Sequence, residues 1–144
     1  MTAKQYLQSY RRLRGHYNAI VEEYLAAEND MITLKSPKFG DRTMSSAKND
    51  PIGDIVCRLE DKKAKIGIWM VESSTKMMMI ESQVREMNSI NPDYYVILSL
   101  RYLLDKDWRF ICEKICMSRA QANVVHGMAL KEFDAIYGST YHDL

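Results

Sequence analysis

The chain has 144 residues, of which 47% are hydrophobic and 27% charged, and its formal net charge is +1. This length fits one domain, or a small module with a helical arm, and the apolar fraction is sufficient for a packed core. A net charge this small excludes a general electrostatic attraction to nucleic acid, so any DNA contact has to come from a local patch.

The counts of special residues favour an all-α protein with free thiols. Six Gly and three Pro are too few for a turn-rich β fold. The three Cys are an odd number, and the chain opens without an apolar leader, so we expect reduced cysteines in the cytoplasm. Since no apolar run approaches the length of a membrane span, we expect no membrane contact.

The first predicted element is a helix over about 2–28, with Thr2 as its N-cap. Its apolar residues are spaced alternately by four and three, as in a coiled coil. They are Tyr6, Tyr10, Leu13, Tyr17, Ile20, Tyr24 and Ala27. The period is lost over about 29–50, a stretch rich in Ser, Lys, Asp and Gly, which we predict to be a mobile surface loop.

A second long helix is predicted over 51–89, with Asp50 as its cap and Pro51 at its first position. The predicted apolar stripe consists of Ile52, Ile55, Leu59, Ile66, Trp69, Ser73, Ile80 and Met87, widened by Met70, Met77 and Val84. The two long helices should pair as an antiparallel hairpin or coiled-coil arm covering residues 1–89.

Three shorter helices are predicted beyond this arm, over about 92–104, 107–115 and 118–137. Asn91, Asp107 and Ser118 are their caps, and Ser118 forms a capping box with Gln121. We expect the last helix to stop at Gly138, which leaves 139–144 as a tail. The region 90–138 therefore has the proportions of a helix-turn-helix domain.

One face of this region should be buried and another exposed. The expected inward residues are Ile111, Ile115, Met117, Ala122, Val125, Ala129, Leu130 and Phe133, with Cys112 where two helices cross. The expected exposed front of the last helix consists of Arg119, Ala120, Gln121, Asn123 and Val124. Gln and Asn can bond adenine in the major groove, and Arg can bond guanine or a phosphate, although a merely solvated helix face has the same composition.

Residues 96–133, "VILSLRYLLDKDWRFICEKICMSRAQANVVHGMALKEF", resemble the fourth conserved region of bacterial sigma factors. The matching residues are Leu100, Arg101, Tyr102, Leu103, Ile111, Glu113, Ser118, Arg119, Ala129, Leu130 and Lys131. The whole chain resembles phage-encoded sigma-like regulators of late genes, including ArpU-type proteins and a related phage family of unknown function. That resemblance rests on the opening "AKQYL", a variable loop, a long helix and the closing "HGMAL".

The resemblance implies a sequence-specific DNA-binding regulator of phage or prophage late transcription in the cytoplasm of a bacterial host. It implies that Ser118 caps its helix and touches a phosphate, while Arg119, Gln121 and Asn123 face base edges. Lys106, Arg109 and Lys114 would hold the DNA backbone. It also implies RNA polymerase as a partner. The segment 101–133 carries only +2, so a homodimer through the N-terminal helices, or docking on the polymerase, would supply further affinity.

The sequence departs from the family pattern at three positions. Phe110 replaces an acidic, exposed residue, and we expect it to pack on the N-terminal helices instead. Met128 stands where the family usually has Arg, which removes a candidate phosphate contact. Cys116 stands in the turn where Gly is usual, so we expect the turn to be strained or adjusted.

Two other readings of the function stay open at this point. A small-terminase-like DNA-packaging protein also joins a helix-turn-helix to an oligomerising arm. A protein-interaction module could instead have kept the sigma-like fold and lost DNA binding. We expect no enzyme, because no phosphate loop, nucleophile elbow or His-Glu metal motif is found. We expect no cofactor or metal, since Cys112, Cys116 and His126 lack a fourth ligand.

Overall fold

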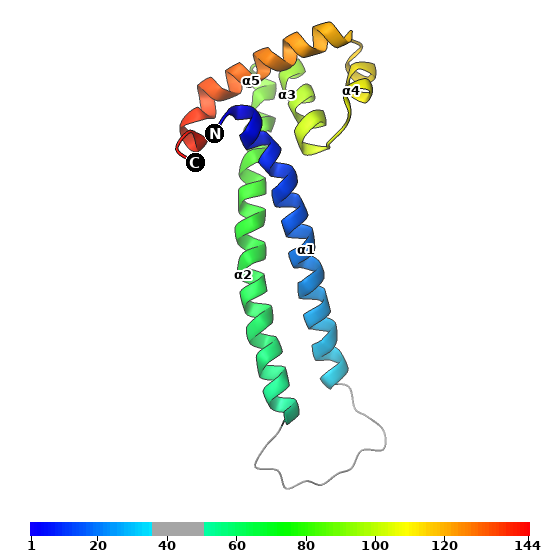
Figure 1. The fold of residues 1–144 in the computed structure, drawn as a ribbon, viewed down its shortest axis with the longest axis vertical. Helices are drawn as coiled ribbons and strands as arrows, with labels where there is room; N and C mark the ends of the chain where they lie inside the picture. The colour runs from blue at the N-terminus through cyan, green and yellow to red at the C-terminus, as the bar shows by residue number, and fades with distance from the viewer. Residues whose placement is uncertain (36–50) are drawn as a thin grey trace. The chain divides into compact units, whose positions relative to one another are not determined.

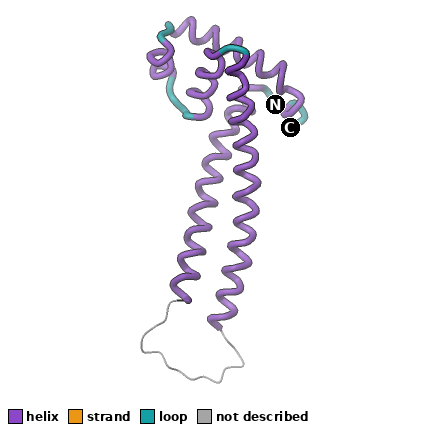
Figure 2. The backbone as a smooth tube through the Cα atoms, turned by 180° about the vertical axis from the view of Figure 1, so that it is seen from behind, coloured by secondary structure: helices purple, strands orange, loops and turns teal. Residues whose placement is uncertain are grey.

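The computed structural model describes residues 1–35 and 51–144, and those ranges contain five α-helices and no strand (Figure 1, Figure 2). The expectation of an all-α fold is therefore confirmed. The two long helices, α1 (Ala3–Lys35) and α2 (Pro51–Glu86), pack antiparallel, as the periodicity predicts. None of the helices in the two described ranges is long and apolar enough to cross a membrane.

Shorter elements follow α2. A single 3₁₀ turn, Met87–Ser89, leads to α3 (Pro92–Leu98), which continues as a π-helical segment, Ser99–Leu103. The last two helices are α4 (Trp108–Ile115) and α5 (Arg119–Tyr141). The three predicted caps are confirmed, because the side chains of Asn91, Asp107 and Ser118 each accept a hydrogen bond from a backbone N–H of the first turn that follows.

The contacts between residues divide the chain into two compact units. The composite unit joins Met1–Gly15 with Ser74–Leu144, and the hairpin unit is His16–Ser73. These limits differ from a boundary near residue 90. The reason is that the first turns of α1 and the last turns of α2 share a core with the short helices.

Aromatic side chains from distant parts of the sequence form the core of the composite unit. The ring of Tyr6 stacks on that of Tyr141 with 4.5 Å between centroids, and Phe133 lies beside both. The Tyr6 hydroxyl donates to Oε1 of Gln83 over 2.9 Å, which satisfies a buried amide. The side chains of Leu7, Phe133 and Tyr141 are wholly buried. The start of α1 and the end of α5 therefore contribute to the same core.

The hairpin unit has a thinner core. In its described part, the buried apolar side chains are Ala27, Met31 and Ile66. The Lys63 ammonium lies 5.2 Å from the centre of the Tyr24 ring and 3.7 Å from a Glu28 carboxylate oxygen, so it links α2 to α1. All seven predicted seam residues of α1, from Tyr6 to Ala27, are buried or half-buried, which confirms the four-three spacing.

The end predicted for the first helix is wrong. The helix does not stop near residue 28 but continues to Lys35, so residues 29–35 are helical and not part of a loop. Met31 is buried and Leu34 half-buried, and both extend the seam of Tyr24 and Ala27 by the same steps of four and three. The rest of the predicted loop, and the predicted cap Asp50, lie outside the described residues.

The predicted stripe on α2 is wrong at three positions. Trp69 is 50% exposed, Ile52 is 55% exposed, and Ile55 is also exposed. The buried and half-buried residues follow a neighbouring row instead. This row consists of Val56, Leu59, Lys63, Ile66, Met70, Ser73, Met77, Ile80, Val84 and Met87. Its steps alternate between three and four without a break, whereas the predicted stripe switched rows.

Gly138 does not end the last helix, which corrects the predicted helix end. Helix α5 passes through Gly138 to Tyr141, so residues 139–141 are helical and not tail. The Tyr141 ring is wholly buried, and its hydroxyl donates to Oδ1 of Asp134 over 2.6 Å. Burial of this ring extends the helix beyond the residue whose local signal would stop it. Here glycine leaves room for the His142 ring, which would lie 2.6 Å from an added Cβ.

Candidate nucleic-acid interface

Helix α4, a short turn and helix α5 form the region predicted to be a helix-turn-helix (Figure 1). Oδ1 of Asp107 accepts a 2.8 Å hydrogen bond from the N–H of Phe110 and so fixes the start of α4. At the start of α5 the predicted capping box is present. The Gln121 N–H donates to Oγ of Ser118, and the Ser118 N–H donates to Oε1 of Gln121, each over 3.2 Å.

The turn between these helices contains a residue in an unfavourable backbone conformation. Cys116 has φ 54° and ψ 43°, the left-handed region where a side chain crowds the backbone. The Met117 N–H donates to the Cys112 carbonyl over 3.2 Å and closes the turn. The expected strain at a position usual for glycine is therefore present.

The inward face of α4 and α5 agrees with the sequence pattern. Ile111, Ala122, Ala129 and Phe133 are wholly buried, whereas Ile115, Met117, Val125, Leu130 and Cys112 are half-buried. This packing fixes which side of α5 is left toward solvent. The expected front is confirmed in its exposure, because Arg119, Ala120, Gln121, Asn123 and Val124 are all exposed.

The two amide side chains of this front differ in whether the capping box already uses them. Oε1 of Gln121 already accepts a hydrogen bond from the Ser118 N–H. The side-chain NH₂ group of Gln121 takes no part in the capping box. Bidentate bonding to adenine needs both ends of an amide, so Gln121 would have to share its oxygen. Asn123 lies on the same exposed front and has no part in the cap.

A tryptophan platform lies at the start of α4. The Arg101 and Arg119 guanidinium carbons are 5.3 Å and 4.9 Å from the centre of the Trp108 ring, and the His126 ring meets the indole edge-on at 4.8 Å. A guanidinium held on an aromatic face keeps its N–H groups available at its rim. Trp108 therefore gathers two arginines that are distant in sequence, and sequence reasoning did not assign it a role.

A phenylalanine platform holds two of the predicted backbone contacts. The Lys106 and Lys114 ammonium groups lie 5.1 Å and 5.5 Å from the centre of the Phe110 ring. The third predicted contact, Arg109, is 89% exposed in its side chain and forms a 3.6 Å ion pair with Glu113 on the next turn. An exposed ion pair of this kind contributes little to stability, so Arg109 can exchange the Glu113 carboxylate for a phosphate. The three cations and Ser118 are all exposed.

His126 lies among aromatic side chains and is partly buried. Its Nε2 lies 2.7 Å from the Tyr102 hydroxyl, and its ring stacks near the Tyr102 ring. Burial, together with the positive charges of Lys4 and Arg101, lowers the pKa of His126 to about 4. Burial likewise raises the pKa of Tyr102 to about 12. At neutral pH the pair is therefore an uncharged hydrogen bond that supports the platform of Trp108.

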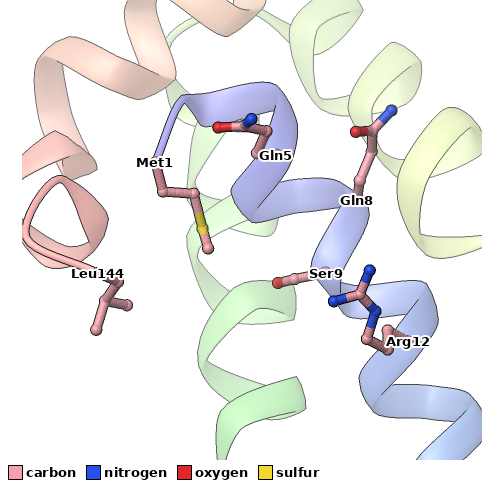
Figure 3. Close-up of a pocket in the computed structure, with 6 residues that line it drawn as sticks. All are labelled: Met1, Gln5, Gln8, Ser9, Arg12 and Leu144. Atoms are coloured by element: carbon pink, nitrogen blue, oxygen red, sulfur yellow. The ribbon is translucent and has the colours of Figure 1, made fainter.

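Other parts of the described chain carry less chemistry. A hollow of about 470 Å³ is lined by the first turns of α1 together with Met1 and Leu144. Figure 3 shows the six side chains that line it. Its polar side chains are Gln5, Gln8, Ser9 and Arg12.

The three cysteines are free, and Cys57 is exposed. Among the described residues no group of three His, Cys, Asp or Glu is placed to hold a metal ion.

Comparisons of the chain with protein families, with curated proteins and with solved structures find no match.

Proposed function

We propose that the chain is a sequence-specific DNA-binding regulator of phage or prophage late genes that acts through a sigma-like helix-turn-helix. The observation that carries the proposal is the capped α4–turn–α5 unit with an exposed, polar and cationic front. Helix α5 would lie in the major groove with Arg119 and Asn123 toward base edges. Gln121 would add a contact through its free amide end, and the exposed Ser118 hydroxyl would touch a phosphate.

The backbone contacts would come from the two aromatic platforms. Lys106 and Lys114, on either side of Phe110, and Arg109 would hold phosphates. Arg101, paired with Arg119 on Trp108, joins this proposed set. Because neutralising each phosphate releases counterions, the binding constant should fall steeply as salt rises.

Partner contacts belong to the same proposal. RNA polymerase is the partner that the resemblance implies, and a homodimer through the N-terminal helices would double the DNA contact. Leu25, Ile68 and Trp69 are exposed apolar side chains of the hairpin unit that such a dimer could cover.

The test is fluorescence anisotropy with promoter and intergenic duplexes from the source genome at 50 and 200 mM salt, concentrations over which a site of several phosphates loses affinity strongly. The expected result is selective binding that weakens with salt.

Replacing Lys114 by Ala should reduce the slope of log K against log salt by about 0.9. Lys65→Ala is the matched control, because Lys65 is exposed on α2 in the hairpin unit. Equal binding by wild type and by an Arg119→Ala/Asn123→Ala variant would reject the site.

A second candidate function is a protein-interaction module with the same fold. Val124 and Met128, 62% and 50% exposed on α5, favour it, because large apolar side chains on a helix front also suit a protein groove. Binding to the polymerase without any salt-dependent DNA binding would identify this function. A mass of many subunits in sedimentation would instead favour the DNA-packaging alternative.

A further inference from the structure

The front of α5 combines its polar residues with an apolar strip that the proposed base contacts do not use. Ala120, Val124 and Met128 follow one another at intervals of four, so they lie along one side of the helix. All three are exposed. Beside the first two lies an open hollow of about 580 Å³, whose other lining residues are Ile115, Cys116, Met117, Gln121 and Val125.

Packing within the chain does not account for the strip. The buried side of α5 is formed by Ala122, Ala129 and Phe133, so Val124 is not required for the core. Single exposed apolar residues are common. Here, however, the valine borders an apolar hollow at the very front that carries Asn123 and Arg119, in the first two turns of the helix.

The charge around the strip identifies the class of occupant. Arg109, Lys114 and Arg119, all exposed, belong to the α4–turn–α5 unit that carries the strip. An apolar strip on a helix front that also carries Arg119 complements the major groove, where a methyl group lies between two rows of phosphates. Thymine is the base that presents a methyl group there, and small apolar side chains are its usual contacts.

We propose that Ala120 and Val124 contact the 5-methyl groups of thymines, so that the target contains thymine opposite the first two turns of α5. This inference rests on the proposed function. It also assigns to an apolar contact part of the discrimination that Gln121, engaged in the capping box, cannot give in full. Valine suits such a contact, because its branched side chain has few rotamers to lose on binding.

The experiment begins with a duplex selected by the wild-type protein from a random pool. Each thymine of that duplex is then replaced singly by deoxyuracil, which removes the methyl group and keeps the base pair. At one or two positions we expect affinity to fall by about fourfold, the effect of one buried methyl-sized group. Val124→Ala should bind the thymine and uracil duplexes nearly equally at the position that Val124 covers.

A matched control separates this contact from general weakening. Asn123→Ala, on the same turn, should bind more weakly but keep the fourfold preference for thymine. If wild type selects a duplex and no uracil replacement changes its affinity, the methyl contact is wrong while the DNA-binding function stands. If no duplex is selected and no salt-dependent binding is found, the proposed function fails and this inference fails with it.

Discussion

The composite unit and the hairpin unit each contain segments of the two long helices, yet they are stabilised differently. In the composite unit, long side chains such as Leu7, Phe133 and Tyr141 are wholly buried, and buried polar groups such as Gln83 have partners. Among the described residues of the hairpin unit, Ile66 is the only large side chain buried to that extent, whereas Trp69 on the next turn is half exposed. Two paired helices bury only the stripe that each turns toward the other, whereas in the composite unit the shorter helices cover further faces of α1 and α2.

This comparison predicts that substitutions in the composite unit carry the larger cost. Phe133→Ala should lower the free energy of unfolding by about 3–5 kcal/mol, because it removes a wholly buried ring beside Tyr6, Tyr137 and Tyr141. Urea denaturation followed by circular dichroism measures this cost. Phe110→Ala, at a half-buried ring, is the control and should cost clearly less. A loss below about 1 kcal/mol for Phe133→Ala would contradict the dense core.

The stability of the composite unit should also depend on pH through His126. Its pKa is about 4 in the folded chain and about 6.5 when unfolded, so unfolding takes up a proton between these values. The free energy of unfolding should therefore fall by roughly 1–2 kcal/mol from pH 7 to pH 5 and level off below pH 4.

Denaturation at several pH values tests this effect. His126→Phe should remove that part of the slope, whereas His16→Gln, at an exposed histidine on α1, should leave it unchanged. An unchanged slope in His126→Phe would show that the ring is not held neutral by folding.

A smaller effect with the opposite sign is expected in the turn between α4 and α5. Cys116→Gly should raise the free energy of unfolding by about 1 kcal/mol, because glycine adopts a φ of 54° without crowding. Thermal unfolding under reducing conditions measures the change. Cys57→Gly, inside α2, is the contrasting variant and should destabilise by about 0.3 kcal/mol, the difference in helix propensity between the two residues. Destabilisation by Cys116→Gly would show that the cysteine side chain contributes more than its strain costs.

The smallest effect is expected for Trp69 in the hairpin unit. At concentrations where sedimentation shows a monomer, Trp69→Gln should change the free energy of unfolding by less than about 0.5 kcal/mol, since the side chain is half exposed. Ile66→Ala, one turn earlier and buried, is the matched comparison and should cost about 2–5 kcal/mol. A cost for Trp69→Gln that appears only at high concentration would indicate that a second chain covers it.

Local signals in the sequence predicted more of this molecule than signals that depend on tertiary contacts. Asn91, Asp107 and Ser118 were identifiable as caps because a cap needs only its own first turn. Gly138 has an equally clear local signal, but the burial of Tyr141 overrides it. The four-three spacing predicts the seam of α1, and Met31 continues this spacing within a stretch whose composition favours a loop.

For the candidate site, the sequence predicts which side chains of α5 are exposed, but it does not predict the contacts among the side chains of the site. The exposed front from Arg119 to Val124 follows from helical periodicity. The approach of Arg101 and Arg119 to Trp108 does not, because the three residues belong to three different elements. Cap chemistry predicts that Gln121 is engaged by Ser118, and the same engagement reduces its value for reading bases.

The stacking of Tyr6 on Tyr141 also orders events during synthesis. A ribosome adds α1 first and Tyr141 more than a hundred residues later, so the buried surface of the first turns has to wait for its partner. Since α1 and α2 in the hairpin unit pair between nearer segments, they can associate while the rest of the chain is still being made. In the interval, Tyr6 and Leu7 are exposed apolar groups on a nascent helix, which is where a chaperone would be expected to bind.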